Sequence, residues 1–364
     1  MAKKPEEIIR DEVRELSAYH VPDARGMVKL DAMENPYALP DTVRAQVAEV
    51  VARAELNRYP DPAATRLRNE LKGVLGVPAG MNILLGNGSD EIIQMLVMAT
   101  ARPGATVLGV EPSFVMFRMI AAICGVRFAA VPLKANFELD VERMLAALEE
   151  IQPALVFLAY PNNPTGNLFD ERAIERVLEK APGLVVIDEA YHAFAGRTFL
   201  DRLSQHANLL VMRTLSKSGL AGLRLGLVAG SDAWLRHVDK VRLPYNVGVL
   251  TQLVTEQALQ HRLLFDEQAA AIRTERTRVY DELKRTRGIT PYPSEANFIL
   301  FRTAAAPAAY DGLKQRRVLV KNLHGSHPAL EGCLRVTVGT PAENDRFLTA
   351  LREALGAIPV SPST

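Results

Sequence analysis

The chain has 364 residues, of which 48% are hydrophobic and 23% are charged, and its 43 Lys and Arg nearly balance 42 Asp and Glu. This length predicts about two domains with large cores. The near-zero net charge gives no electrostatic reason to expect nucleic acid or a membrane surface as a partner. Cys124 and Cys333 are too few and too far apart for a disulfide framework or a metal cluster. The first residues lack the apolar core of a signal peptide, and no run reaches transmembrane length. We therefore expect a cytoplasmic protein with no metal site.

The N-terminal segment and the middle of the chain differ in pattern. Ile9, Val13 and Leu16 lie on one stripe, which predicts a single amphipathic helix within residues 1–35, followed by an extended polar segment. The middle alternates short apolar runs with longer helical patterns. Strands are predicted at 82–85, 106–110, 127–131, 154–160, 184–188, 208–214 and 225–229, and helices between several of them at 90–100, 141–150 and 170–180.

Most of these strand runs are continuously apolar, which is typical of strands buried on both faces. Strands that alternate with helices of this length predict an α/β fold, with a mostly parallel sheet between helices. After Asn246 the pattern predicts a long helix over 249–286, an Ala/Pro loop at 304–309, strands at 297–302, 318–321 and 333–338, and a last helix near 344–354. We expect a large domain over 36–246 and a smaller α+β domain formed by both chain ends, 1–35 and 247–364.

Lys217 follows a predicted strand, within the run Thr-Leu-Ser-Lys-Ser-Gly-Leu-Ala-Gly-Leu-Arg-Leu-Gly at 214–226. The pKa of a lysine falls readily on burial, which leaves a neutral amine that can form a Schiff base with an aldehyde. Ser216 and Arg224 are placed to hold a phosphate near that amine. A lone lysine in a polar turn is more often a solvated surface residue, so the interpretation depends on the other strand ends.

A glycine-containing turn at 86–91, Gly-Asn-Gly-Ser-Asp-Glu, leads from the first of these strands into a helix. Ser89 is a good N-cap, and the free N–H groups of a helix N-terminus, here at Ser89 and Asp90, favour a phosphate. The turn fails as a dinucleotide fingerprint because Glu91 stands where a third glycine is required. A plain strand-to-helix turn is the alternative.

Three further predicted strands end in residues suited to a pyridine ring. In Pro-Asn-Asn-Pro-Thr-Gly at 161–166, Asn163 presents a side-chain donor, although a rigid turn alone also explains this motif. Asp188 ends an apolar strand, where a carboxylate is costly unless it is paired with a cation such as a protonated pyridine nitrogen, or caps the next loop. Tyr191 could reach the same ring oxygen as Asn163, and Phe114 could stack on the ring or belong to the core.

These residues together resemble a known family. Asn163, Asp188, Lys217 and Arg224 follow each other at 25, 29 and 7 residues, each at the end of a different predicted strand. The set resembles the fold type I, class II (aspartate-aminotransferase-like) enzymes that use pyridoxal 5′-phosphate (PLP), and most closely the histidinol-phosphate aminotransferases. The resemblance is carried by the runs at 31–37, 57–61, 86–91, 162–166, 188–191, 216–217 and 333–340.

The resemblance implies a role for each residue of the site. Lys217 would be the catalytic residue, carrying PLP as a Schiff base and then moving a proton. Asp188 would pair with the pyridine nitrogen. The remaining cofactor-binding residues would be Asn163 and Tyr191 at the ring oxygen, Phe114 on the ring face, and Ser89, Asp90, Ser216, Arg224 and Tyr59 at the phosphate. Tyr59 would act from a neighbouring subunit, which implies a homodimer with shared sites; an anchor for a Tyr-Pro turn is the alternative.

Arg335 resembles the arginine that grips the carboxylate of the amino acid substrate, because a guanidinium binds planar oxyanions through two hydrogen bonds. In this family the same arginine would also meet a substrate phosphate. Further substrate-binding residues would be Lys321, Asn322, Tyr19, Tyr59 and Asn35. Some family members have an arginine where Lys321 stands. A lysine keeps the positive charge but cannot form the two parallel hydrogen bonds of a guanidinium. A solvated lysine at a strand end is the alternative.

The resemblance implies an aminotransferase of histidine biosynthesis. It would pass the amino group between L-glutamate and imidazole acetol phosphate by a ping-pong mechanism, giving L-histidinol phosphate and 2-oxoglutarate. The alternatives are an aromatic or broad-specificity aminotransferase and a threonine-phosphate decarboxylase of the same fold. A PLP-binding transcription regulator is disfavoured because residues 1–35 are too short for a DNA-binding domain. A nicotinamide dehydrogenase is disfavoured by the failed glycine pattern.

Overall fold

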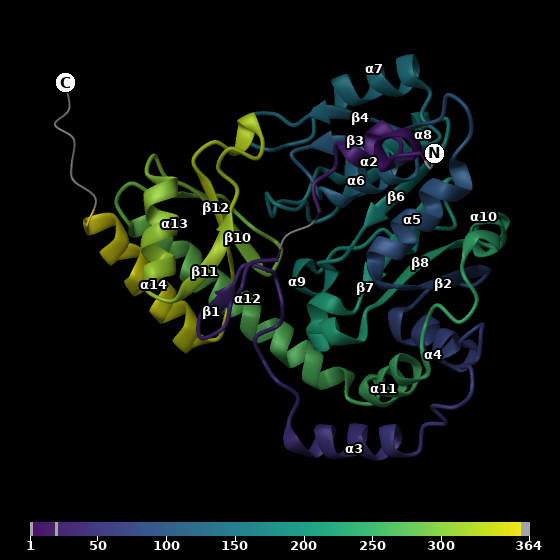
Figure 1. The fold of residues 1–364 in the computed structure, drawn as a ribbon, viewed down its shortest axis with the longest axis horizontal. Coiled ribbons are helices and arrows are strands. Elements are labelled where there is room, and N and C mark those ends of the chain that lie inside the picture. Colours follow the sequence, from purple (N-terminus) through teal and green to yellow (C-terminus); the bar gives the residue numbers. More distant parts are fainter. Residues whose placement is uncertain (1–2, 19–20, 358–364) are drawn as a thin grey trace.

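The computed structural model describes residues 3–18 and 21–357, and it shows two lobes joined by the long helix α12 (Arg262–Arg285) (Figure 1). The larger lobe is built on a seven-stranded sheet of order β2-β8-β7-β6-β5-β3-β4. Its strands are β2 (Met81–Asn87), β3 (Thr106–Glu111), β4 (Arg127–Pro132), β5 (Leu155–Ala159), β6 (Leu184–Asp188), β7 (Leu209–Thr214) and β8 (Leu225–Ser231). β8 runs antiparallel to both of its neighbours, β2 and β7, and the other pairs are parallel, so the predicted mostly parallel sheet is confirmed.

Both faces of this sheet are buried, as the continuous apolar runs predicted. On β5, Phe157 contributes to the core on one face, whereas Val156 and Leu158 contribute to the core on the other. Helices α5 (Gly88–Thr100), α6 (Met116–Ile123) and α10 (Asp232–Val238) supply the first core. Helices α4 (Thr65–Leu75), α7 (Val141–Ile151) and α8 (Glu171–Lys180) supply the second. The sheet therefore lies between two layers of helices, and a ligand can bind only at the ends of its strands, where the polar residues lie.

The smaller lobe contains a five-stranded sheet of order β1-β11-β12-β10-β9. Its strands are β1 (Val28–Leu30), β9 (Thr290–Pro291), β10 (Phe298–Arg302), β11 (Val318–Asn322) and β12 (Cys333–Thr337). β1 pairs in parallel with β11, with Val28 opposite Val318. Residues from both ends of the chain thus share one sheet, although the domain boundaries given above stay a prediction.

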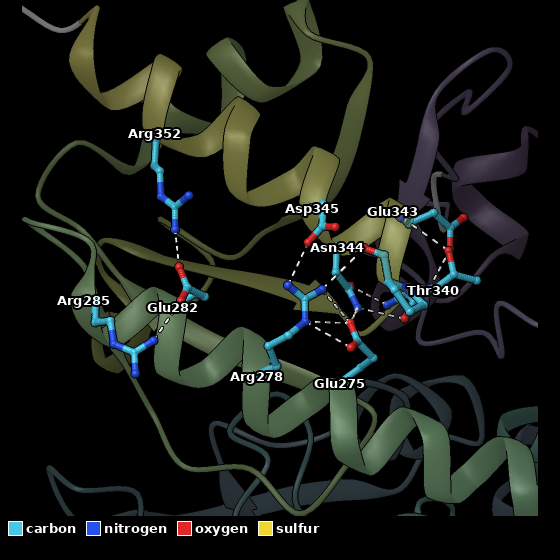
Figure 2. Close-up of polar contacts among 11 residues, drawn as sticks. Glu275, Arg278, Glu282, Arg285, Thr340, Glu343, Asn344, Asp345 and Arg352 are labelled. Carbon is cyan, nitrogen blue, oxygen red and sulfur yellow. Dashed lines mark hydrogen bonds and ion pairs between the residues drawn. The ribbon is translucent and has the colours of Figure 1, made fainter.

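The helices of the smaller lobe are α12, α13 (Ala306–Gln315) and α14 (Pro341–Gly356). Figure 2 shows how α12 and α14 are joined: Arg278 pairs with Glu275 on its own helix and with Asp345 on α14, at 2.7 Å in each case. Glu282 on α12 likewise pairs with Arg352 on α14. These contacts are partly exposed, so the buried apolar side chains beneath them supply most of the stability.

Two predicted helices are each divided in the structure. The single N-terminal helix was wrong, because α1 (Pro5–Ile8) and α2 (Asp11–Arg14) are separated by extended backbone at Ile9 and Arg10. Arg10 there donates a hydrogen bond to the carbonyl of Ile123 at the end of α6. The long helix was also wrong, because α11 (Val249–Leu259) ends before His261, whose ring is 2.6 Å from Gln46 on α3 (Asp41–Ala52).

The predicted Ala/Pro loop is in part the first turn of α13. Pro307 stands in that first turn, where an N–H is not needed for the helix and the fixed φ of proline is favourable. No helix in the ranges 3–18 and 21–357 is both long and apolar enough to cross a bilayer.

Candidate active site

The polar strand ends of the larger sheet meet at one cavity, as expected where parallel strands share an edge. Nine of the residues predicted to bind the cofactor line it: Ser89, Asp90, Phe114, Asn163, Asp188, Tyr191, Ser216, Lys217 and Arg224. They follow β2, β3, β5, β6 or β7 or precede β8, except Asp188, which is the last residue of β6. Because β5, β6 and β7 are neighbours, Asn163, Asp188 and Lys217 come together although they are far apart in sequence.

Lys217 lies on a short π-helical turn directly after β7, at Ser216–Leu220. Its Nζ donates to the carbonyl of Ala32, at 3.3 Å, and lies 5.9 Å from the centre of the Tyr191 ring. Burial, and secondly the positive charge of Arg335, lower the pKa of Lys217 to about 8. A substantial fraction of this amine is therefore neutral and nucleophilic near physiological pH.

Asp188 is the last residue of β6 and is 4% exposed. Its Oδ1 accepts a hydrogen bond from the backbone N–H of Ala190, at 3.0 Å, and no cation in the described part of the chain forms an ion pair with it. Burial raises the pKa of Asp188 to about 7. A buried acid of this kind is suited to a cationic partner that enters the cavity, such as a protonated pyridine nitrogen.

The backbone at the start of α5 is packed directly against β8. A Cβ at Gly226 would lie 2.5 Å from the carbonyl carbon of Gly88 and 2.7 Å from the nitrogen of Ser89, so only glycine allows this approach. Gly88 itself has φ +82°. Arg224, in a left-handed conformation with φ 50°, places Nη2 3.2 Å from Asp90. The result is a helix N-terminus with an adjacent guanidinium, a combination that fits a phosphate group.

The cavity as a whole fits PLP. Lys217 offers an amine for the aldehyde, Asp188 an acid for the ring nitrogen, and Arg224 a cation for the phosphate. Asn163 accepts from Arg335 through Oδ1, which leaves its NH₂ group to donate to the ring oxygen. The donor set therefore matches each polar group of the cofactor.

A second cavity of about 440 Å³ adjoins the first, because Met33, Phe114 and Asn163 line both. Arg335, Lys321 and Asn322, all predicted to bind substrate, line this second cavity. Its size is that of an ordinary small-ligand site.

Arg335 and Lys321 are partners across the β11–β12 ladder, so two cations share one wall of the second cavity. Arg335 is 6% exposed; it donates to Asn163 and, at 3.0 Å, to the carbonyl of Asp31. Burial, followed by the charge of Arg335, lowers the pKa of Lys321. Two adjacent cations in a half-buried cavity make a site for a carboxylate or a phosphate.

Three predicted residues lie elsewhere. Tyr59 is 80% exposed, lines neither cavity, and stacks on Tyr245 with ring centres 4.3 Å apart. Asn35 lines neither cavity and donates to Gln268, at 2.9 Å. Tyr19 lies outside the described residues. The roles given to these three residues stay predictions.

Met33 is a residue that the sequence did not single out, and it lines both cavities with φ 53°. A methionine has no chemical signature of a site, since it most often fills apolar cores. The available signal was its position in the run 31–37, the same run that supplies the carbonyl of Ala32 to Lys217.

Comparisons with known proteins agree with this geometry. The family described as aminotransferase class I and II matches residues 25–351. The chain is 54% identical to histidinol-phosphate aminotransferase 2 of Cupriavidus pinatubonensis, over 96% of this chain and 97% of that protein. It is 53% identical to histidinol-phosphate aminotransferase 1 of Ralstonia nicotianae, over 97% of this chain and 96% of that protein.

The fold is also that of a solved structure with its cofactor. The histidinol-phosphate aminotransferase from Sinorhizobium meliloti, in complex with pyridoxal-5′-phosphate, superposes with a TM-score of 0.86. It is 26% identical, and the match covers 96% of this chain and 98% of that one.

Proposed function

The chain belongs to the class I and II aminotransferases, a PLP-dependent family, and from this we propose that it is a histidinol-phosphate aminotransferase. Its reaction passes the amino group of L-glutamate to imidazole acetol phosphate, which gives L-histidinol phosphate and 2-oxoglutarate in histidine biosynthesis. Identity above 50% over nearly the full length of two relatives with this name supports the proposal.

One structural observation carries the choice of a phosphorylated substrate: Arg335 and Lys321 lie side by side in the cavity that adjoins the cofactor site. A single guanidinium suffices for the carboxylate of glutamate, whereas a phosphate dianion is better matched by two cations. The same pair can therefore serve both substrates of a ping-pong reaction.

The residues of the chain divide the work of the reaction. PLP, when bound, supplies an electron-withdrawing ring that stabilises negative charge at the substrate carbon. Lys217, with its lowered pKa, removes the proton from the substrate Cα and later returns one. Asp188 would pair with the ring nitrogen and favour its cationic form, and Asn163 with Tyr191 would hold the ring oxygen. Arg335 and Lys321 hold the anionic end of the substrate, so that the Cα proton points toward Lys217.

A homodimer in the cytoplasm completes the proposal. Leu56, Tyr59 and Leu243 are each at least 70% exposed, and Tyr245 is 40% exposed. Exposed apolar side chains in such number are typical of a surface that is covered in an assembly. We expect Tyr59 to reach the cofactor phosphate of the partner subunit, because it lies outside the cavities of its own chain.

The test is a titration of the PLP-loaded protein, followed by the visible absorption band of the bound cofactor. Loss of that band at low L-histidinol phosphate, with little response to L-phenylalanine or O-phospho-L-threonine, would support the proposal. A preferential response to phenylalanine would indicate an aromatic aminotransferase instead. Carbon dioxide release from O-phospho-L-threonine would indicate a decarboxylase.

A further inference from the structure

The two lobes contribute different charged groups to the second cavity: Lys321 and Arg335 from the smaller lobe, and the ion pair of Glu111 with Arg118 from the larger lobe. Lys321 and Arg335 stand on the wall formed by the smaller lobe, whereas the opposite wall contains the end of β3 and the start of α6. Among the described residues that line this cavity, Glu111 alone carries a carboxylate. A ligand that binds across the cavity therefore meets two cations at one end and, at the other, a carboxylate that is paired with Arg118.

Glu111 is held in place with one oxygen free. Its Oε1 accepts a hydrogen bond from Nε of Arg118 on α6, at 2.7 Å, and lies 2.5 Å from Nη2 of the same guanidinium in an ion pair. The guanidinium of Arg118 also lies over the ring of Phe128, 4.9 Å from its centre. Oε2 of Glu111 has no hydrogen-bond partner among the described residues, and the side chain is 29% exposed. The carboxylate is thus oriented but still able to accept.

We propose that Glu111 recognises the imidazole ring of the substrate by accepting a hydrogen bond from a ring N–H. The inference rests on the proposed function. L-Histidinol phosphate carries a phosphate and an imidazole on opposite sides of the carbon that bears the amino group, so its ends match the two walls. Phe128 and Val115 supply apolar surface for the ring beside the carboxylate. Arg118 acts as a positioning residue, because it orients Glu111 rather than the substrate.

The second substrate, L-glutamate, should respond to the loss of the Glu111 charge in the opposite direction. In L-glutamate the α-carboxylate takes the place of the phosphate arm, so the side-chain carboxylate extends toward the position of the imidazole. Glu111 would repel that carboxylate, whereas Arg118, its ion-pair partner in the same cavity, would attract it. Removing the charge of Glu111 should therefore weaken L-histidinol phosphate and leave L-glutamate unchanged or tighter, a divergence that a general loss of structure does not produce.

The experiment compares wild type with Glu111→Gln and Glu111→Leu on three amino donors, each in its half-reaction with the PLP-loaded enzyme. The donors are L-histidinol phosphate, L-phenylalaninol phosphate, which has a phenyl ring in place of the imidazole, and L-glutamate. We expect kcat/KM for L-histidinol phosphate to fall about tenfold in Glu111→Leu and less in Glu111→Gln, which keeps one acceptor oxygen. The values for L-phenylalaninol phosphate should stay within about twofold.

A binding measurement without turnover accompanies the kinetics. Calorimetry in a Lys217→Ala background should show the same selective loss of affinity for L-histidinol phosphate. The matched control is Glu142→Gln, since Glu142 is also paired with an arginine, Arg176 at 2.8 Å, but lies on α7 outside both cavities. It should behave as wild type with all three donors.

The outcomes separate the two proposals. Equal losses for the imidazole and phenyl substrates, or no loss for either, would overturn the role of Glu111 while the enzyme stays a histidinol-phosphate aminotransferase. A wild-type enzyme that turns over L-glutamate but ignores L-histidinol phosphate would overturn the proposed function itself, and the role of Glu111 with it.

Discussion

Two buried ionisable groups, Asp188 and Lys217, line the same cavity with pKa values displaced toward each other, to about 7 and about 8. Burial is the main cause in both cases, because it disfavours the charged form of an acid and of a base alike. Each group therefore changes its charge near neutral pH. The cofactor meets an amine that can attack and an acid that can pair.

The lowered pKa of Lys217 predicts how fast the cofactor-free protein captures PLP. Only the neutral amine attacks the aldehyde, so the second-order rate constant should rise with pH and level off above about 8. Below that pH it should fall about tenfold per unit. Stopped-flow absorbance at the visible band measures this rate. A rate that continues to rise toward pH 10 would mean that Lys217 has an ordinary lysine pKa.

Asp188 predicts a pH dependence of stability. Its pKa is raised on folding, so the unfolded chain loses the proton from about pH 4 while the folded cofactor-free protein keeps it until about pH 7. The folded state binds more protons in this window, and its stability should fall as pH rises from 4 to 7 by a few kcal/mol, on the order expected for a buried acid.

Asp188→Asn should remove this loss. Urea unfolding of the two cofactor-free proteins at pH 5 and pH 8 measures it, and wild type should lose stability relative to the variant between these values. Saturating PLP should restore most of the loss in wild type, because a cationic ring nitrogen pairs with the ionised acid. Parallel pH curves for the two proteins would contradict the burial of an uncompensated carboxyl at this position.

At the scale of the elements, β6 and β7 are joined by a buried ion pair just beyond Asp188. Arg213 Nη2 lies 2.8 Å from Oε2 of Glu189, and the two side chains are 6% and 0% exposed. Glu189 also accepts from Thr198 and from the backbone of Phe199. This network fixes the end of β6, and hence the position of Asp188, without touching the cavity.

Arg213→Met should be strongly destabilising, since it leaves Glu189 buried without its cation. We expect a loss of about 3–5 kcal/mol in the free energy of unfolding. Arg176→Met, which breaks an exposed pair with Glu142, should cost about 0–1 kcal/mol. Urea unfolding of both variants checks the contrast. Similar small losses would mean that the buried pair is compensated by water or by protonation of Glu189.

The elements that the sequence predicted well have local signals. β6 begins and ends at the predicted residues, Leu184–Asp188, because an apolar run that is buried on both faces ends abruptly at an acid. The break between α11 and α12 had no such signal: His261 lies at the break and contacts a residue far away in sequence, Gln46. The three-residue strand β1 was likewise missed, because its partner β11 is distant along the chain.

The site residues likewise divide into those that the sequence could indicate and those that only the fold reveals. Residues with distinctive chemistry at strand ends, such as Asp188 and Lys217, could be assigned from the sequence because the sheet brings those ends together. Glu111 and Arg118 could not, because the role proposed for Glu111 depends on which residues share its cavity. Met33 has no chemical signature, and only the fold places it between the two cavities.

At the scale of the whole molecule, the proposed dimer predicts complementation between two defective variants. In Lys217→Ala the amine is missing, and in Tyr59→Ala the partner's cofactor phosphate loses its tyrosine. A mixed dimer of the two has one site with both residues intact. Refolding an equal mixture should restore wild-type PLP affinity to roughly a quarter of the sites. Lys217→Ala refolded alone should have no activity, and Tyr59→Ala refolded alone should bind PLP more weakly at every site. No gain on mixing would mean that each site is built from one chain.

The pairing of β1 with β11 also affects how this molecule is made. Val28 leaves the ribosome roughly 290 residues before its partner Val318, which at typical rates of synthesis is a delay of about 15 to 60 s. Throughout that time the nascent chain carries an edge strand with no partner, while the larger lobe can already fold. We expect the smaller lobe to be the last part to close during translation, and its first strand to be the segment that a chaperone must protect.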